Sequence, residues 1–194
     1  MESTTTLSQT PMPGDDYASI ARDVATMNAA AWLTDDRPAW RSTFHDDVTL
    51  IVQPSAAFTV PWAGVYVSFA SVSAFNDLMQ SCMLWDKEKI VFSGYRPNSA
   101  DPHNTNLCER TVQLVGAFVP TGNRFDFVMN EYIEAKDGKL FRSVITFDEA
   151  EVSRQFWGTT QRPADQAIDA LKLSVVSSRQ LPLCIAPLLK GHQR

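Results

Sequence analysis

The sequence has little of what nucleic-acid-binding and metal-binding proteins need. Its 17 Lys and Arg residues are outnumbered by 22 Asp and Glu residues, and the formal net charge is −5. A protein that neutralises phosphates carries a basic patch, whereas these basic residues are scattered, so we expect no nucleic-acid partner. The three cysteines show no CxxC spacing and no HExxH pattern occurs, so we expect no metal site.

Signatures of cofactor-dependent enzymes and of membrane proteins are also missing. The sequence contains no Gly-rich phosphate loop and no GxSxG elbow, so we expect no cofactor. Its apolar stretches are far shorter than the roughly 20 residues that cross a bilayer, so we expect no membrane partner. Residues 1–14 are polar and lack the apolar core of a targeting signal, so we predict a disordered leader and a soluble, cytoplasmic protein.

The composition fits one folded domain with additional segments at its ends. The chain has 194 residues, and one ordinary core accounts for about 130 to 150 of them. We predict a domain over residues 15–157, followed by a partly helical C-terminal extension over residues 158–194. A hydrophobic content of 44%, with five Trp and eleven Phe, provides a large interior and indicates a cavity lined with aromatic rings.

The late middle of the chain is the most informative stretch. The polar turn 136–139 joins two alternating segments and predicts an antiparallel hairpin with one buried face. Asp148, followed by Glu151, is close to a capping box, so a helix should begin where the last strand ends. With helical periodicity in the first half, this pattern predicts an α+β fold whose curved sheet wraps around helices. We expect helices at about 16–34, from Pro38 and from Ser71, and strands at about 48–53, 88–94, 108–119, 124–134 and 139–147.

The order of these elements resembles the nuclear transport factor 2-like superfold over about residues 16–157. The residues that carry the resemblance are Phe44-x-Asp46-Asp47-Val48, Trp62-Ala63-Gly64, the Gly138-Lys139 turn and Phe147-Asp148. Within this superfold, the chain is most similar to SnoaL-like polyketide cyclases and to the ketosteroid isomerase-like family. The resemblance implies a cone formed by a mixed, mainly antiparallel sheet around N-terminal helices. It also implies a homodimer, and the apolar C-terminal tail is consistent with packing on a second subunit.

Ketosteroid isomerase uses a general-base aspartate and two oxyanion-hole groups, and this chain departs from it at all three positions. The resemblance places the base at Val52 or Gln53, the oxyanion-hole tyrosine at Asn28 and the protonated aspartate at Asn130. An amide is not a useful general base, so the isomerase mechanism is not supported. The remaining features are hydrogen-bonding groups that can polarise a carbonyl.

The alternation of the last strands predicts which side chains face the cone. A buried unpaired Arg is costly, so Phe141, Ser143, Ile145 and Phe147 should point inward in place of Arg142. The partner strand then points Asp126, Val128, Asn130 and Tyr132 inward. We expect Arg110 to lie deep and near Asp126. The candidate catalytic residues are Asp126, Arg110 and Asn130, and the candidate substrate-binding residues are Asn28, Trp32, Gln53, Trp62, Tyr132, Ser143 and Phe147.

These candidates admit more than one function. We predict a cofactor-independent cyclase or isomerase that acts on a hydrophobic polyketide or terpenoid intermediate of secondary metabolism, by ring closure or a pericyclic step. A dehydratase, an epoxide-opening enzyme and a non-catalytic ligand-binding or dimeric assembly module remain alternatives. Arg110 and Asp126 can form a structural ion pair instead of an acid/base pair. An open cavity with converging polar groups indicates an enzyme, whereas a cone filled by side chains indicates a module.

Overall fold

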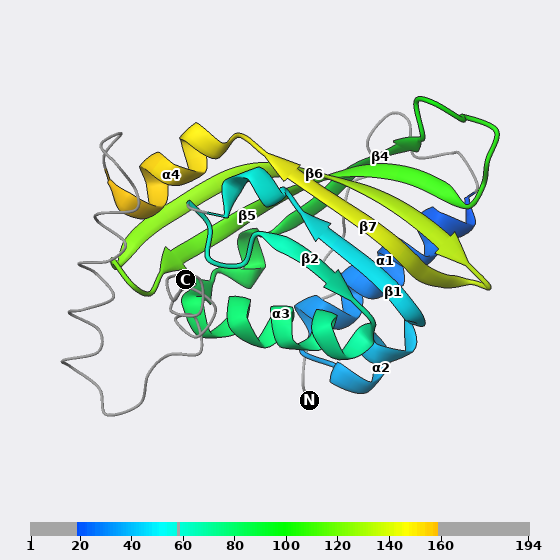
Figure 1. Ribbon diagram of the computed structural model, residues 1–194, viewed down its shortest axis with the longest axis horizontal. Helices are drawn as coiled ribbons and strands as arrows, with labels where there is room; N and C mark the ends of the chain where they lie inside the picture. The colour runs from blue at the N-terminus through cyan, green and yellow to red at the C-terminus, as the bar shows by residue number, and fades with distance from the viewer. Residues whose placement is uncertain (1–18, 58, 159–194) are drawn as a thin grey trace, which may run out of the picture.

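The computed structural model describes residues 19–57 and 59–158, which form four α-helices and a seven-stranded sheet (Figure 1). The predicted leader and the predicted helix at 164–176 lie outside these residues. The helices are α1 (Ile20–Leu33), α2 (Arg37–Ser42), α3 (Phe69–Cys82) and α4 (Glu149–Trp157), with short 3-10 turns at Pro54–Ala56 and Lys87–Lys89. The strands are β1 (Phe44–Val52), β2 (Gly64–Val67), β3 (Met83–Trp85), β4 (Val91–Pro97), β5 (Leu107–Phe118), β6 (Asn123–Lys136) and β7 (Lys139–Phe147).

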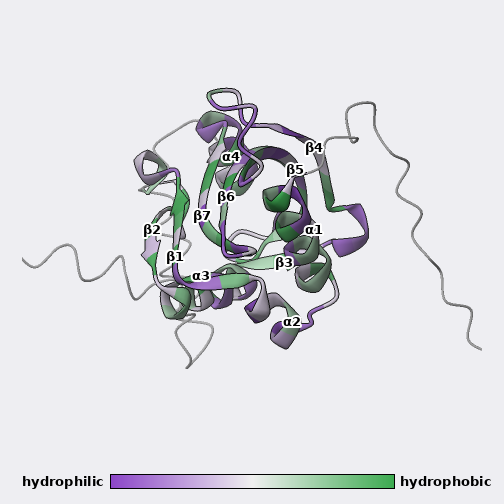
Figure 2. Ribbon diagram, turned by 90° about the vertical axis from the view of Figure 1, so that its right-hand side faces the viewer, coloured by the Kyte–Doolittle hydropathy of each residue, from purple (hydrophilic) through white to green (hydrophobic). Residues whose placement is uncertain are grey.

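The sheet is mixed and curved, as predicted for the α+β cone. Its order is β2-β1-β7-β6-β5-β3, and β4 pairs with β5. Strands β1 and β7 are parallel, and all other pairs are antiparallel. Viewed from the side, the strands bend around α1, with α2 and α3 below it (Figure 2). No helix among the described residues is long and apolar enough to span a membrane.

Side-chain caps define where α1, α2 and α4 start. The Asp148 side chain accepts a hydrogen bond from the Glu151 backbone N–H at 3.1 Å, which confirms the predicted start of α4 directly after β7. The Asp36 side chain caps α2 in the same way. Helix α1 begins behind Ser19, whose hydroxyl accepts from the Arg22 N–H.

The hairpin of β6 and β7 contains an irregularity that the sequence analysis did not foresee. Asp137 and Gly138 have φ values of 52° and 69°, typical of a two-residue hairpin turn. Ala135 pairs with Leu140, but Glu134 pairs with Arg142, so Phe141 is an extra residue in β7. Such a bulge changes the register by one residue, and a one-residue change turns every side chain of the partner strand to the other face.

Two short strands were not predicted. Strands β2 and β3 have four and three residues and carry no clear alternation. Strand β3 lies close against Gly116 of β5, where a Cβ atom would meet the Leu84 carbonyl oxygen at 2.3 Å. Glycine therefore permits this close approach of two backbones.

An aromatic cluster closes the end of the cone that is covered by α4. The rings of Phe118 and Phe156 stack with centroids 4.5 Å apart, and Trp62 packs on Phe156 at 5.5 Å. Phe125 and Phe127 also contact the Phe156 ring. Because these rings are large and buried, they fill this end of the cone.

Candidate functional site

A cavity of about 110 Å³ lies between the concave face of the sheet and helices α1 and α3. An engineered cavity of about 150 Å³ can hold benzene, so this space matches a small single ring. Most of its wall is apolar or aromatic, and its five polar residues are Asn28, Asn76, Arg110, Glu131 and Ser143. The predicted site residues that line it are Asn28, Trp32, Trp62, Arg110, Ser143 and Phe147.

Arg110, Glu131 and Ser143 form a buried polar cluster on the sheet side of this cavity. The Arg110 Nε and Nη2 atoms contact Glu131 Oε2 at 2.7 and 2.6 Å. The Ser143 hydroxyl donates to Glu131 Oε1 at 2.6 Å. Arg110 and Glu131 are only 4% and 6% exposed, so each charge depends on the other and on these hydrogen bonds.

Further contacts of Arg110 connect the cluster to α1 and β4. Its Nη1 atom donates to the Ala25 carbonyl oxygen at 2.8 Å and to the Tyr95 hydroxyl oxygen at 3.4 Å. The guanidinium also lies 4.6 Å from the centre of the Phe92 ring. Burial by itself would lower the pKa of Arg110, but the Glu131 carboxylate and Tyr95 raise it above its ordinary value, so the guanidinium stays charged.

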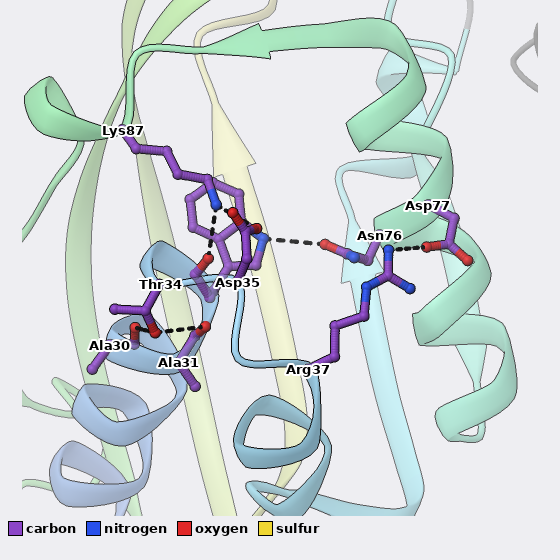
Figure 3. A network of polar contacts seen from close by, with 9 residues as sticks. Ala30, Ala31, Thr34, Asp35, Arg37, Asn76, Asp77 and Lys87 are labelled. Carbon is purple, nitrogen blue, oxygen red and sulfur yellow. Dashed lines mark hydrogen bonds and ion pairs between the residues drawn. The ribbon is translucent and has the colours of Figure 1, made fainter.

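Two amide side chains line the cavity from the helices. The Asn28 Nδ2 atom donates to the Thr43 hydroxyl oxygen at 2.9 Å, and Asn28 is 8% exposed. One turn later on α1, the indole N–H of Trp32 donates to Asn76 Oδ1 on α3 at 3.1 Å (Figure 3). These bonds orient both amides at the wall of the cavity.

A second, more polar pocket of about 310 Å³ lies beside the cavity and shares Trp32, Trp40 and Asn76 with it. Figure 3 shows the contacts around this outer pocket: Lys87 binds the Trp32 carbonyl oxygen and the Asp35 carboxylate, and Arg37 binds Asp77. The two spaces together reach the several hundred Å³ that a drug-sized ligand needs. Trp32 stands at their boundary.

Asp126, Asn130 and Tyr132 do not face the cavity, and the prediction that they point inward is wrong. Asp126 is exposed and accepts a hydrogen bond from Gln113 Nε2 at 2.9 Å on the outer face of the sheet. Asn130 is also exposed, and Tyr132 is half-buried on that same outer face. The prediction assumed a regular hairpin, and the bulge at Phe141 reverses the facing of β6. Phe141 itself packs against His45, away from the predicted inward set.

The remaining predictions for individual residues have mixed outcomes. Arg110 is deep, as predicted, but its partner is Glu131 and not Asp126. Gln53 does not line the cavity, because its side chain accepts from the Phe147 N–H at 2.8 Å and ties β1 to the end of β7. The three amides Asn28, Gln53 and Asn130 therefore do not converge.

The analysis of the sequence missed Glu131 and Asn76 as residues of the cavity wall. Glu131 was detectable, because every second residue of β6 from Phe125 to Ala135 is otherwise apolar. A charged residue within such a series indicates a buried, paired group. Asn76 gave no comparable signal, since its contact with Trp32 depends on how α3 packs.

Comparisons with known proteins support the fold. No family model and no curated protein matches the chain. An NTF2-like protein of unknown function from Burkholderia pseudomallei has a TM-score of 0.58 at 14% identity, over 71% of this chain and 98% of its own. A "putative polyketide cyclase" from Pseudomonas putida has a TM-score of 0.53 at 14% identity, over the same shares of the two chains.

TerC, co-crystallised with polyporic acid, has a TM-score of 0.53 at 13% identity, over 67% of this chain and 92% of its own. At such identities, the likeness concerns the fold and not the activity. The curved mixed sheet around α1, the hairpin that runs into α4 and these structural matches agree with the resemblance seen in the sequence. The chain therefore has the NTF2-like fold.

Proposed function

We propose that the protein is a cofactor-independent cyclase or isomerase that acts on a hydrophobic polyketide or terpenoid intermediate. The observation that carries this proposal is the buried cluster of Arg110, Glu131 and Ser143 at the wall of an otherwise apolar cavity. A purely structural core rarely contains a charged pair beside empty space. The likeness in fold to the Pseudomonas putida protein and to TerC is consistent with this class of substrate.

In this proposal, the catalytic residues are Glu131, Ser143 and Arg110, in place of the predicted Asp126 and Asn130. The Glu131 carboxylate is the proton acceptor, either directly or through the Ser143 hydroxyl that bonds to its Oε1. Arg110 holds the other carboxylate oxygen and places positive charge where an enolate or alkoxide would develop. The aromatic wall holds the substrate in a folded conformation, so that the reacting atoms are close before the bond forms.

The test is turnover of a panel of polyketide and terpenoid precursors, followed by mass spectrometry. Glu131→Gln should lower the rate at least about 100-fold, because it removes the proton acceptor. Ser143→Ala should lower the rate about tenfold, because it removes the hydroxyl partner of that acceptor. Asp126→Asn is the matched control on the outer face and should retain the wild-type rate. Equal rates for Glu131→Gln and wild type, with a folded variant confirmed by circular dichroism, would contradict the proposal.

The same assay separates the alternatives by the mass of the product. A cyclase or isomerase leaves the mass unchanged, a dehydratase lowers it by one water, and an epoxide-opening enzyme raises it by one water. A binding or assembly module gives no product, although a ligand would still raise the melting temperature.

We also propose that the chain forms a homodimer through the outer face of the sheet. Val91, Gln113 and Val128 lie side by side across three strands of this face, and Val91 and Val128 are 41% and 52% exposed. These two exposed valines flank Gln113, and apolar side chains exposed on one sheet face are consistent with an interface between two copies of the chain. Sedimentation of the wild type and of Val128→Glu tests this, because a dimer should become a monomer in the variant, whereas a monomeric wild type would contradict the proposal.

A further inference from the structure

Asn28 presents an unused hydrogen-bond acceptor to the cavity, and its orientation is determined by its neighbours. The Thr43 hydroxyl donates its hydrogen to the Trp40 carbonyl oxygen at 2.7 Å, so it can only accept from Asn28. The Asn28 NH2 group must therefore point to Thr43, and its Oδ1 atom is turned away from Thr43. No described residue donates a hydrogen bond to this oxygen, and Asn28 lines the cavity.

Asn76 is oriented in the opposite sense. The indole N–H of Trp32 can only donate, so the atom of Asn76 that it contacts at 3.1 Å must be the carbonyl oxygen. The NH2 group of Asn76 is then an unused donor, because it bonds to no described residue, and Asn76 is only 7% exposed. The amide lines both the cavity and the outer pocket.

Trp85 provides a second unused donor beside Asn76. Its indole N–H is buried and has no hydrogen-bond partner among the described residues, and Trp85 lines the cavity. The Trp85 ring packs edge-on against Trp32 with centroids 5.3 Å apart, so this donor belongs to the same side of the cavity as the Trp32–Asn76 contact. A buried polar group without a partner is destabilising, so such groups in a cavity wall indicate a ligand that satisfies them.

The acceptor and the donors lie along one edge of the cavity. Asn28 and Trp32 are four residues apart on α1 and therefore occupy the same face of the helix, about 6 Å apart. Asn28 offers an acceptor at one level, and Asn76 with Trp85 offers donors about one turn further along. The sheet side of the cavity is apolar at Phe127, Met129 and Phe147 and polar at the cluster of Arg110, Glu131 and Ser143.

We propose that the cavity selects a ring-containing, mostly apolar ligand that carries a hydroxyl group and a carbonyl-type oxygen at separate positions on one edge. Asn28 Oδ1 accepts from the hydroxyl, and Asn76 Nδ2, together with the indole N–H of Trp85, donates to the carbonyl oxygen. Thr43 is a positioning residue, because it keeps the Asn28 amide in the accepting orientation. This inference deepens the proposed function by naming the chemistry of the substrate, but it concerns binding and not turnover.

The experiment uses four ring probes of nearly equal size and measures their affinity for the full chain by calorimetry. 4-Hydroxybenzaldehyde has both groups, p-cresol has the hydroxyl only, p-tolualdehyde has the carbonyl only, and p-xylene has neither. We expect 4-hydroxybenzaldehyde to bind most tightly, with each single-group probe about fivefold weaker, because one neutral hydrogen bond is lost. p-Xylene should be the weakest.

Variants assign each bond to its residue. Asn28→Leu should weaken p-cresol about fivefold and leave p-tolualdehyde unchanged, and Asn76→Leu should do the reverse. Thr43→Val keeps the volume but frees the Asn28 amide to turn, so the variant should lose the preference for the hydroxyl probe. Asn130→Leu is the matched control, because it makes the same replacement on the outer face, and it should change none of the four affinities.

Three outcomes would overturn the inference. They are equal affinities of the four probes for the wild type, no measurable binding of any probe, and an equal change in all four affinities on Asn28→Leu in a protein that remains folded. The result is independent of turnover. An inactive protein that still discriminates the probes would contradict the proposed function alone, whereas an active protein without discrimination would contradict this inference alone.

Discussion

The two faces of β6 place similar carboxylates in opposite environments. On the inner face, Glu131 is nearly inaccessible and its charge is held by Arg110 and Ser143. On the outer face, Asp126 is exposed, its carboxylate accepts from the Gln113 amide, and its backbone N–H donates to the Gln155 side chain. The residues are five positions apart and chemically alike. An odd spacing places them on opposite faces of the strand, and the extra residue in β7 decides which face is the inner one. Register, rather than residue type, therefore assigns a carboxylate to a site or to solvent.

Removing one carboxylate from each face tests their unequal burial. Glu131→Ala leaves the Arg110 charge buried without its partner and should lower the free energy of unfolding by about 3–5 kcal/mol. Asp126→Ala should change it by less than about 0.5 kcal/mol, since an exposed side chain is solvated in both states. Urea unfolding measures both values. Similar losses in the two variants would mean that the faces do not differ in the way the contacts indicate.

Two hydroxyl groups on opposite faces of β7 allow the same comparison of inner and outer side chains, with a smaller expected effect on stability. Ser143 faces inward and donates to Glu131 Oε1, whereas Thr146 lies exposed on the outer face of the strand. Ser143→Ala should cost about 1–3 kcal/mol, because it removes a hydrogen bond to a buried charge. Thr146→Ala should cost only a few tenths of a kcal/mol. Urea unfolding of both variants in one denaturant series measures the two losses in the free energy of unfolding. A larger loss for Thr146→Ala than for Ser143→Ala would be incompatible with the described facing of β7.

The pH dependence at alkaline pH sharpens the comparison of inner and outer side chains. Burial raises the pKa of Tyr66 to about 12, and its hydroxyl donates to the Trp62 carbonyl oxygen at 2.7 Å. Because the pKa is higher in the folded state than the ordinary value of about 10, this stabilisation is complete below pH 10 and is lost as the pH rises to about 12. After allowance for solvent screening, we expect a loss of about 1–2 kcal/mol over that range.

Tyr66→Phe provides the control for this titration. The variant should show a smaller decline in stability between pH 10 and pH 12 than the wild type, measured by urea unfolding at each pH. Burial raises the pKa of Tyr132 on the outer face as well, and Tyr132→Phe should alter the profile less. Identical profiles for the wild type and Tyr66→Phe would contradict the assignment to Tyr66.

Much of the fold was accessible from local patterns. The turn at Asp137-Gly138, the cap at Asp148 and the helical periodicity around Val24 each depend on residues close together in the chain, and all three were predicted correctly. The inward facing of Arg110 also followed from simple alternation within β5. Strands β2 and β3 were missed because short edge strands are defined by their partners more than by their own residues.

The candidate site was less accessible, and its errors share a cause. Ser143 and Phe147 were predicted to face inward and do so, but the same argument carried over to β6 failed, because the pairing of two strands is a tertiary property. Gln53 was expected at the cavity, yet it bonds to the backbone of β7. An amide has several possible partners, and only packing decides which of them it meets.

Short stretches of the sequence therefore determined the helices and strands, their caps and turns, and the identity of the fold. Hydrogen bonds and side-chain periodicity act in these stretches over only a few residues. The pairing of Arg110 with Glu131, the directions in which Asn28 and Asn76 point, and the cavity that they border appeared only in the folded chain. These features depend on a one-residue bulge and on contacts between distant segments. Neither can be predicted from the residues next to each position in the sequence.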